Sequence, residues 1–530
     1  MSSTFEERAA MYIEKGYWRK LSLFEELKNW TSQYSSNIAI VSGEQRITYA
    51  ELYQKSQELA GGILNLGIVP GDRVIVQLPN ISEFLILCFA LFRIGVIPVL
   101  TLPASRENDI YALCQISGAT GYIGVEEYLN FEYSDIAKRL VKSLNVKHII
   151  SAKGKLPFAT DINDLYMTPP DIVYPNFRDI ALLLLSGGTT GTPKLIPRTH
   201  TDYSYCSRTY AGQCGLSTST AYLTVLPAAH NFPLTSPGML GTFSCGGKVV
   251  LQETPAPDES FSLIEKEKIT ITGLVPSLLK VWLENRKWDM SDLSSLKIII
   301  VGGEKVDPNL IAQVKPEFGA CPIQGFGTAE GLNTHTNLTD TDEVLLTTQG
   351  KPISEDDEII FIDESGNIVD DSIGGEMLTR GPYTIQGYYN LPEINKLMFT
   401  EDGFYKTGDL GKRRPDGNIL ITGRIKEQIN RAGEKISPIE LENYICEIPQ
   451  VESAAVVGLP DPDLGEKICA VIISQDTNLD LFSIHNFLEL KGVARYKFPD
   501  QLELVESFPH TNVGKVDKKA LIKKLTNKSN

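Results

Sequence analysis

The residues best suited to chemistry in this 530-residue chain form a loop after an apolar stretch. Residues 181–185 read Ala-Leu-Leu-Leu-Leu and predict a buried strand. The chain then reads Ser-Gly-Gly-Thr-Thr-Gly-Thr-Pro-Lys, from Ser186 to Lys194. Glycines bring backbone N–H groups close to an anion, hydroxyls add donors, and the lysine adds positive charge. These residues predict a phosphate-binding loop.

Two other interpretations of this loop are weaker. A plain flexible turn does not require seven small or hydroxyl residues in a row before Pro193 and Lys194. The loop of P-loop NTPases needs Gly-Lys-Ser/Thr running into a helix, whereas here Leu195 follows the lysine. The pattern therefore indicates phosphate chemistry of another kind.

Four later stretches combine glycine with charged or hydroxyl residues. They are QGFGTAEG at 324–331, YKTGDL at 405–410, GRIKEQINRAGEKISPIELE at 423–442 and PHTNVGK at 509–515. Each alone could be ordinary surface: a solvated glutamate, a turn aspartate, a charged hairpin and a lysine-rich tail. Their order and completeness single them out.

Together these stretches resemble the motifs of the adenylate-forming superfamily, which includes acyl- and aryl-CoA ligases, peptide-synthetase adenylation domains and luciferases. The resemblance covers essentially the whole chain. It implies ATP and Mg²⁺ as cofactors and attack of an acid on the α-phosphate. The residues that it assigns to ATP are Ser186, Gly187, Gly188, Thr189, Thr190, Gly191, Lys194, Gly302, Gly303, Glu304, Gln324, Gly325, Phe326, Gly327, Thr328, Asp409, Arg424 and Lys515.

The resemblance also implies individual roles. Thr328 would bond the α-phosphate, and Glu330 would bind Mg²⁺. Lys515 would bridge the acid and the nucleotide; with Lys194 these are the expected catalytic residues. The lysines beyond Lys515, including Lys518, are expected to be solvated.

The resemblance also assigns two residues to the ribose of ATP. It assigns three more to a second reaction step, in which a thiol attacks the acyl-adenylate. Asp409 and Arg424 are the expected ribose contacts. Lys426 falls on the family's hinge, and a loop with Gly433 and Lys435 would line the thiol channel. Glycine there lets the backbone approach a narrow passage.

The substrate class is suggested by two further segments. Gly-Tyr-Trp at 16–18 and Leu-Pro-Ala-Ala-His-Asn at 226–231 resemble 2,3-dihydroxybenzoate–AMP ligases of catechol siderophore synthesis. An asparagine amide both donates and accepts, which suits a phenol beside a carboxylate. The residues expected to bind the aryl acid are His230, Asn231, Phe232, Ser236 and Asn333. Phe232 and Asn333 depart from the usual pattern, so salicylate or another hydroxybenzoate stays open.

The resemblance thus implies a two-step ligase. The aryl acid becomes aryl-AMP, and the aryl group then passes to the phosphopantetheine thiol of an aryl carrier protein, which is expected in trans. The alternatives are an aryl-CoA ligase that uses free coenzyme A and a non-catalytic adenylate-binding protein. The intact Lys194, Glu330, Asp409, Arg424 and Lys515 argue against the second.

Composition limits the partners. A net charge of −16 argues against nucleic acid or an anionic membrane as a partner. The eight cysteines show no CxxC or Cys/His cluster, which favours reduced thiols and a cytoplasmic enzyme. The first residues carry no signal-peptide core, and the longest apolar run, 84–92, is too short to span a bilayer.

Alternating strand and helix patterns must position these motifs. Helices are expected at 49–66, 82–94 and 261–268, and strands at 72–78, 248–252 and 297–301. They predict an α/β fold with two mixed or parallel sheets flanked by helices. We expect an N-terminal domain over residues 1–425, β-rich from about 350, and a small mobile α+β domain over 426–530.

Overall fold

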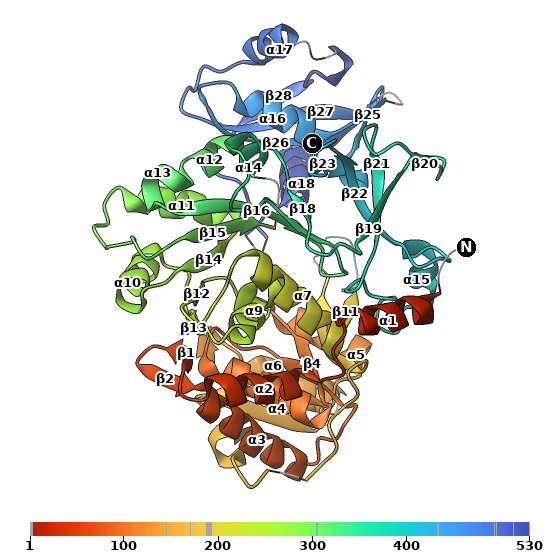
Figure 1. Ribbon diagram of the computed structural model, residues 1–530. Coiled ribbons are helices and arrows are strands. Elements are labelled where there is room, and N and C mark those ends of the chain that lie inside the picture. Colours follow the sequence, from red (N-terminus) through yellow and green to blue (C-terminus); the bar gives the residue numbers. More distant parts are fainter. Residues whose placement is uncertain are drawn as a thin grey trace.

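The computed structural model describes residues 4–144, 146–169, 171–186, 193–303, 306–431, 434–491, 493, 495–511 and 514–528. In Figure 1 the elements after β23 gather at the top, above the sheets built by the preceding chain. The α-helices are α1 (Phe5–Glu14), α2 (Leu23–Tyr34), α3 (Tyr49–Asn65), α4 (Ser82–Ile94), α5 (Glu107–Ser117), α6 (Ser134–Leu144), α7 (His200–Gln213), α8 (Asn231–Thr235), α9 (Gly238–Ser244), α10 (Pro257–Glu267), α11 (Pro276–Arg286), α12 (Pro308–Ala312), α13 (Val314–Phe318), α14 (Asp342–Thr347), α15 (Pro392–Met398), α16 (Pro438–Cys446), α17 (Leu481–Leu490) and α18 (Lys518–Lys528).

Two large sheets form the centre of the N-terminal part. The first has the order β18 (Lys351–Pro352), β17 (Asn333–His335), β16 (Cys321–Gly327), β15 (Ile298–Gly302), β14 (Ile271–Leu274), β12 (Ala221–Thr224), β13 (Lys248–Leu251), β1 (Ile38–Ser42), β2 (Gln45–Thr48). The second has the order β11 (Leu195–Thr199), β10 (Ile180–Leu185), β4 (Ile97–Leu100), β3 (Arg73–Val76), β5 (Gly121–Val125), β8 (His148–Lys153), β9 (Ala159–Asp161). Their central strands pair in parallel, while β2, β11, β17 and β18 pair antiparallel at the edges. The predicted α/β class is confirmed.

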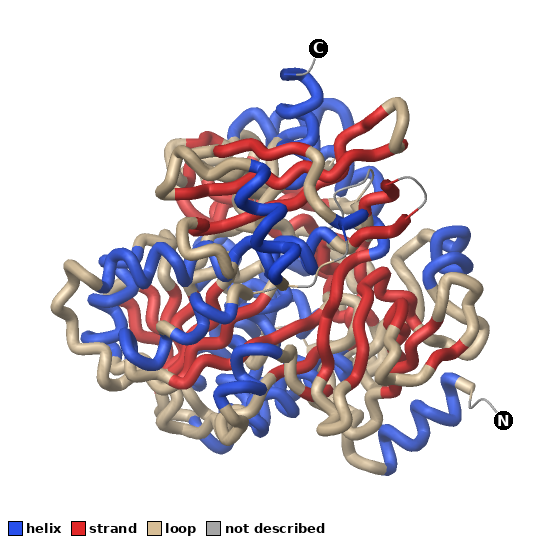
Figure 2. The backbone as a smooth tube through the Cα atoms, turned by 90° about the horizontal axis from the view of Figure 1, so that it is seen from above, coloured by secondary structure: helices blue, strands red, loops and turns tan. Residues whose placement is uncertain are grey.

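The local sequence explains these elements. Every residue of β15 is buried, as expected for a parallel strand covered on both faces. All of α4 is buried except Glu83, and the helix ends at Gly95 with φ of 66°. Thr48 and Glu51 form a capping box that starts α3. Viewed from above, helices flank the strands on both sides at the left of the view (Figure 2).

Two smaller sheets follow along the chain. One has the order β20 (Ile368–Val369), β19 (Glu358–Ile362), β21 (Gly375–Arg380), β22 (Tyr405–Arg413), β23 (Ile419–Arg424), at the place of the expected β-rich region. The other joins β25 (Glu434–Ile436), β24 (Ile429–Arg431), β27 (Gly465–Ser474) and β26 (Val451–Asp461), with β28 (Gln501–Leu504) beside β27. Short 3-10 helices are η1 (Ile162–Leu165), η2 (Ile425–Glu427) and η3 (Arg495–Lys497), and β6 (Glu127–Tyr128) pairs with β7 (Phe131–Glu132).

The predicted elements at 49–66, 82–94 and 72–78 correspond to α3, α4 and β3. The expectation that Lys518 is solvated is wrong. Leu521 and Leu525 of α18 are buried against β26 and β27, which brings Lys518 Nζ to 2.7 Å from Glu442 and 3.6 Å from Glu427. Of the helices that the structure describes, none combines the length and apolarity needed to cross a membrane.

Candidate active site

The candidate site lies at the carboxyl ends of the parallel strands in the first sheet. β15 ends at Gly302, β16 ends at Gly327, and the segment after β12 leads to His230. Ligands of open α/β sheets bind at this edge. Motifs far apart in the sequence therefore lie around one edge.

The predicted phosphate loop joins the antiparallel strands β10 and β11. At its base the Ser186 N–H donates to the Lys194 carbonyl at 3.0 Å, and the Lys194 N–H donates to Ser186 Oγ at 3.3 Å. Outside the described residues lie Gly187, Gly188, Thr189, Thr190 and Gly191. Phosphate binding by the tip of the loop stays a prediction.

The Lys194 side chain lies over the Tyr388 ring and interacts electrostatically with two other candidate residues. Its Nζ lies 4.7 Å from the centroid of the Tyr388 ring. Burial lowers the pKa of Lys194, the charge of Lys426 lowers it further, and Glu330 opposes this decrease. Lys194 is thus within electrostatic range of both the predicted hinge and the predicted metal ligand.

Glu330 is held in place by a tyrosine. Its side chain is buried, and Glu330 Oε1 accepts a hydrogen bond of 2.8 Å from the Tyr388 hydroxyl, which lies 3.2 Å from that of Tyr405. Among the residues that the structure describes, no group of three or more His, Cys, Asp or Glu could hold a metal ion. A cation at Glu330 would need oxygens from another molecule, and Mg²⁺ commonly takes them from phosphates.

Other residues of the 324–331 segment differ in their surroundings: some lie at the candidate site, and others pack into the core. Thr328 Oγ1 accepts from the Gly331 N–H at 3.2 Å, which leaves its hydroxyl proton able to donate elsewhere. Gln324 is buried and donates to the Leu345 carbonyl at 2.7 Å. Phe326 is partly buried against the apolar cluster around Leu332 and Ile359. An adenine contact from Gln324 or Phe326 stays a prediction.

Small residues keep two strands close together at this edge. Gly302 and Gly325 are paired between β15 and β16, and a methyl group on Gly302 would lie 2.6 Å from the Gly325 carbonyl oxygen. Gly327 is exposed. Glu304 lies outside the described residues.

Asp409 and Arg424 meet across the hairpin of β22 and β23. Arg424 Nε donates to Asp409 Oδ1 at 2.7 Å. Asp409 Oδ2 is buried without a hydrogen-bond partner among the described residues. Burial raises the pKa of Asp409, Arg424 and Lys515 oppose the increase, and Glu330 adds to it. An unpartnered carboxylate oxygen is available for a ligand hydroxyl.

Lys515 lies within reach of three other motifs. Its Cε is 3.9 Å from where a Cβ on Gly303 would lie. Its charge affects the pKa of Asp409 and adds to the effect of burial, which lowers the pKa of His230 to about 4. His230 is therefore neutral near pH 7. One lysine thus connects the end of β15, the predicted ribose contact and the predicted aryl-acid segment.

Polar residues at the start of α8 form hydrogen bonds with one another and with Tyr203 of α7. The His230 ring Nδ1 accepts from the Phe232 N–H at 3.2 Å. Asn231 Oδ1 accepts from the Tyr203 hydroxyl at 3.0 Å and from Thr235 Oγ1 at 3.4 Å. Its amide oxygen is therefore already engaged, which leaves the amide N–H groups as donors for a ligand.

The other predicted pocket residues lie beside this group. The Phe232 ring lies against β14, because a methyl on Gly273 would be 3.1 Å from its Cζ. Ser236 is buried at the end of α8. Asn333 is buried, and its Nδ2 donates to Cys206 Sγ at 3.2 Å. The departure at Asn333 is thus matched by a partner on α7.

The predicted hinge and thiol channel are described only in part. Lys426 is exposed within η2. Gly433 lies outside the described residues, as does the Lys435 side chain, although residue 435 pairs with Asn430 in the β24–β25 hairpin. The channel stays a prediction.

Three residues of the site were not expected from the sequence. Tyr203 and Tyr388 lie outside the predicted motifs, and Arg198 follows the predicted phosphate loop without a predicted role. The three-residue spacing of Tyr203 and Cys206 places them on one face of a helix, yet the same spacing also describes ordinary core residues. The sequence pattern could not separate the two cases.

The carboxyl group of Asp357, which is connected to Asn333 through the Tyr383 hydroxyl, should make the stability of the protein depend on pH. Asp357 Oδ2 accepts from the Tyr383 hydroxyl at 2.5 Å, and the Asn333 N–H donates to the same hydroxyl at 3.2 Å. Asp357 Oδ1 is buried without a partner among the described residues, although the residue as a whole is partly exposed. Burial raises the pKa of Asp357 from 3.8 to about 8, against the hydrogen bonds from Tyr383 and Ser354.

The unfolded chain therefore releases this proton near pH 4, whereas the folded chain keeps it to about pH 8. The free energy of unfolding should fall between these limits by up to about 1.4 kcal/mol per pH unit. Urea unfolding from pH 4.5 to 8.5 should show this slope reduced in Asp357→Asn and kept in the exposed-site control Glu355→Gln. Equal slopes in all three proteins would contradict the assignment.

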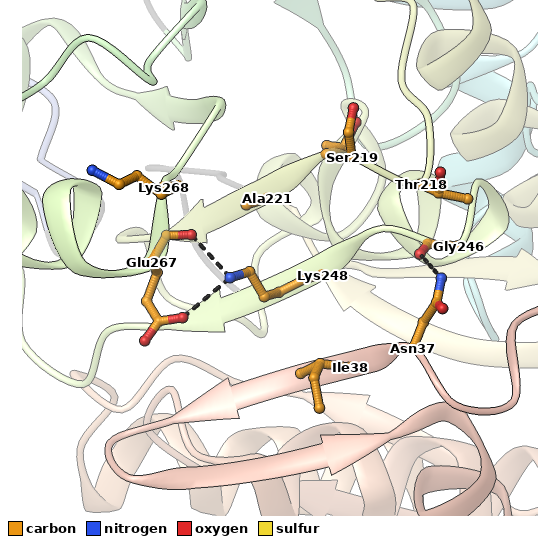
Figure 3. A pocket seen from close by; sticks show the side chains of 10 residues that line it. Asn37, Ile38, Thr218, Ser219, Ala221, Gly246, Lys248, Glu267 and Lys268 are labelled. Carbon is orange, nitrogen blue, oxygen red and sulfur yellow. Dashed lines mark hydrogen bonds and ion pairs between the residues drawn. The ribbon is translucent and has the colours of Figure 1, made fainter.

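A cavity of about 490 Å³ lies away from these residues, where β12 and β13 begin (Figure 3). Two of its polar side chains are paired: Lys248 Nζ contacts the Glu267 carbonyl at 2.9 Å and its carboxylate at 3.1 Å, and Asn37 donates to the Gly246 carbonyl at 3.2 Å. It lies at the opposite ends of the strands from the candidate site. We assign it no role.

Comparisons with known proteins agree with this geometry. The sequence model described as AMP-binding enzyme matches residues 27–389, and that of the AMP-binding enzyme C-terminal domain matches 440–515. The chain is 44% identical over 524 residues to 2,3-dihydroxybenzoate-AMP ligase from Bacillus subtilis (strain 168), covering 99% of this chain and 97% of the relative. It is 39% identical over 532 residues to salicyl-AMP ligase / salicyl-S-ArCP synthetase from Mycobacterium tuberculosis, covering 98% and 93%.

Among solved structures, the apo structure of MbtA from Mycobacterium smegmatis matches with a TM-score of 0.76 at 40% identity and covers 98% of both chains. The family match covers well over half of this chain, and the two relatives cover nearly all of it. The chain therefore belongs to the AMP-binding enzyme family.

Proposed function

We propose that the chain is a 2,3-dihydroxybenzoate–AMP ligase. In the first step a carboxylate oxygen of the acid bonds to the α-phosphorus of ATP, and the bond from that phosphorus to the bridging oxygen breaks to release pyrophosphate. In the second step the thiol sulfur of a phosphopantetheine arm bonds to the acyl carbon, its proton passes to solvent, and AMP leaves. The product is an aryl thioester on a carrier protein.

The observation that carries the proposal is the position of Lys515. It lies near Gly303 and within electrostatic range of His230 and Asp409. A cation between an acid pocket and a ribose site would offset negative charge as carboxylate and triphosphate converge. Such positioning and charge neutralisation is the main contribution that a protein makes to transfer at phosphorus.

The same site accounts for ATP and Mg²⁺. Asp409 Oδ2, which has no hydrogen-bond partner among the described residues, can accept from a ribose hydroxyl, and Lys194 adds charge at the base of the phosphate loop. Glu330 offers one buried carboxylate, which suits Mg²⁺ shared with phosphate oxygens. Bound there, the ion would neutralise phosphate charge.

The choice of acid rests on the groups around α8. Asn231 presents amide N–H donors, Ser236 presents a hydroxyl, and neutral His230 completes a polar wall. These groups suit a carboxylate with a neighbouring phenol. The relatives from Bacillus subtilis and Mycobacterium tuberculosis carry names that specify such acids, which supports the proposal.

The proposal also includes the division of the chain and its partner. We place the change from the large to the small domain at Lys426, as the hinge between two active arrangements. The salicyl-S-ArCP synthetase name of the second relative supports a carrier protein in trans as thiol partner. A cytoplasmic location is supported by the eight cysteines, all of which are free thiols.

Acid-dependent ATP–pyrophosphate exchange tests this function. We expect 2,3-dihydroxybenzoate to give the highest kcat/KM, salicylate a lower one and benzoate the lowest. An unpaired buried polar group costs roughly 1–3 kcal/mol, so each missing hydroxyl should cost about one to two decades. Equal rates with benzoate and 2,3-dihydroxybenzoate would exclude the pocket assignment.

The second candidate is an aryl-CoA ligase. The acceptor separates the two, because both would show the same exchange reaction. Rates of thioester formation with coenzyme A and with a holo aryl carrier protein should favour the carrier. A clear preference for coenzyme A would establish the alternative.

A further inference from the structure

A buried arginine, Arg198, lies between the 328–330 segment and the predicted aryl-acid pocket around Asn231. Arg198 is on β11, four residues after Lys194, and its side chain is 1% exposed. Its Nη1 donates to the Ala329 carbonyl at 2.7 Å, and its Nε donates to Asp202 Oδ1 at 2.9 Å. Nearly complete burial of a guanidinium is costly and requires such partners.

The first contact fixes the segment that carries Thr328 and Glu330. Ala329 lies between them, so its carbonyl direction sets the orientation of both neighbours. The other end of the guanidinium is anchored firmly: Asp202 Oδ2 accepts from the Thr199 N–H at 2.8 Å and from Thr199 Oγ1 at 2.6 Å. That arrangement is the capping box that starts α7.

A second contact extends to the predicted aryl-acid pocket. Arg198 Cζ lies 5.2 Å from the centroid of the Tyr203 ring, within cation–π range. The Tyr203 hydroxyl donates to Asn231 Oδ1 at 3.0 Å. One planar group therefore contacts the 328–330 segment directly and Asn231 through Tyr203.

We propose that Arg198 is a positioning residue that fixes the distance between the 328–330 segment and Asn231, so that the acid is aligned with the α-phosphate. This rests on the proposed adenylation. In-line attack is sensitive to displacements of about 1 Å, which can cost about 10²-fold in rate. Lysine can keep the charge near Asp202, but its single ammonium cannot hold this planar set of directions.

The test is Arg198→Lys in the full chain, measured by ATP–pyrophosphate exchange with 2,3-dihydroxybenzoate. We expect kcat to fall about 10- to 100-fold, and KM for ATP to change less than about threefold because Lys194 and Asp409 remain. The control is Arg93→Lys, another buried arginine, whose Cζ lies 4.4 Å from the Tyr174 ring. It should keep kcat within about twofold, with a similar shift in urea midpoint.

Equal kcat losses in both arginine variants, or a loss confined to KM for ATP, would overturn the positioning role. If Arg198→Lys does not fold, Asp202→Asn keeps the arginine and removes the carboxylate that orients it. The same loss of kcat is then expected, and an unchanged kcat would overturn the inference. No exchange by the wild-type chain with any benzoate would instead refute the proposed function, and this inference with it.

Discussion

Replacing Lys515 with alanine is expected to reduce acid-dependent ATP–pyrophosphate exchange by at least about 10²–10³-fold, the usual effect of losing one preorganised group that stabilises transition-state charge. Transfer of the aryl group from supplied aryl-adenylate to a carrier thiol should stay within about threefold of wild type. The two half-reactions should therefore respond very differently to one substitution.

The difference follows from the charge present in each step. During adenylation the carboxylate and the triphosphate converge where Lys515 lies, near Gly303 and His230. Once pyrophosphate has left, most of that negative charge is gone. We expect the small domain then to turn about Lys426 and carry Lys515 away, as hinge motions do when they assemble two constellations in turn.

Both half-reactions should be measured on Lys515→Ala and on Lys519→Ala. Lys519 is an exposed lysine on the same segment, so its replacement should leave both steps near wild type. Equal losses in exchange and transfer for Lys515→Ala would indicate one fixed active site, and the two-arrangement mechanism would be abandoned.

Much of the fold could be predicted because the apolar patterns are strong. The α4 segment is almost continuously apolar and ends at a glycine, so its bounds at 82–94 were predicted correctly. The expected superfamily and its nearest group were also confirmed. Lys518 shows the limit: a lysine-rich helix looks solvated until its packing against β26 and β27 is known.

Residues of the candidate site could be predicted only where they belong to a recognisable sequence motif. Asp409, Arg424 and Lys515 come from three stretches, and the fold brings them to the same edge as Gly303. Arg198 and Tyr203 could not be found this way. Their importance arises from what they contact across the fold, namely Ala329 and Asn231. Neither contact is local in sequence.

The second large effect is expected at Asp409, because one of its oxygens is prepared for a ligand. Oδ1 is engaged by Arg424 Nε at 2.7 Å, whereas Oδ2 is buried and has no hydrogen-bond partner among the described residues. Leaving that oxygen buried in the free protein is unfavourable, and a ribose hydroxyl would satisfy it. A hydrogen bond to a charged group contributes about 1.5–3 kcal/mol, so Asp409→Ala should raise KM for ATP about 10- to 150-fold.

The same hairpin supplies the control for this prediction. At its exposed tip Asp416 pairs with Arg414 at 3.1 Å, a second aspartate–arginine pair remote from the site. Asp416→Ala should leave KM for ATP unchanged, while KM for the aryl acid should stay within about threefold in both variants. If Asp409→Ala raised both KM values alike, or left KM for ATP at the wild-type value, the carboxylate would be structural. The ribose contact would then have to be sought elsewhere along the edge of the first sheet.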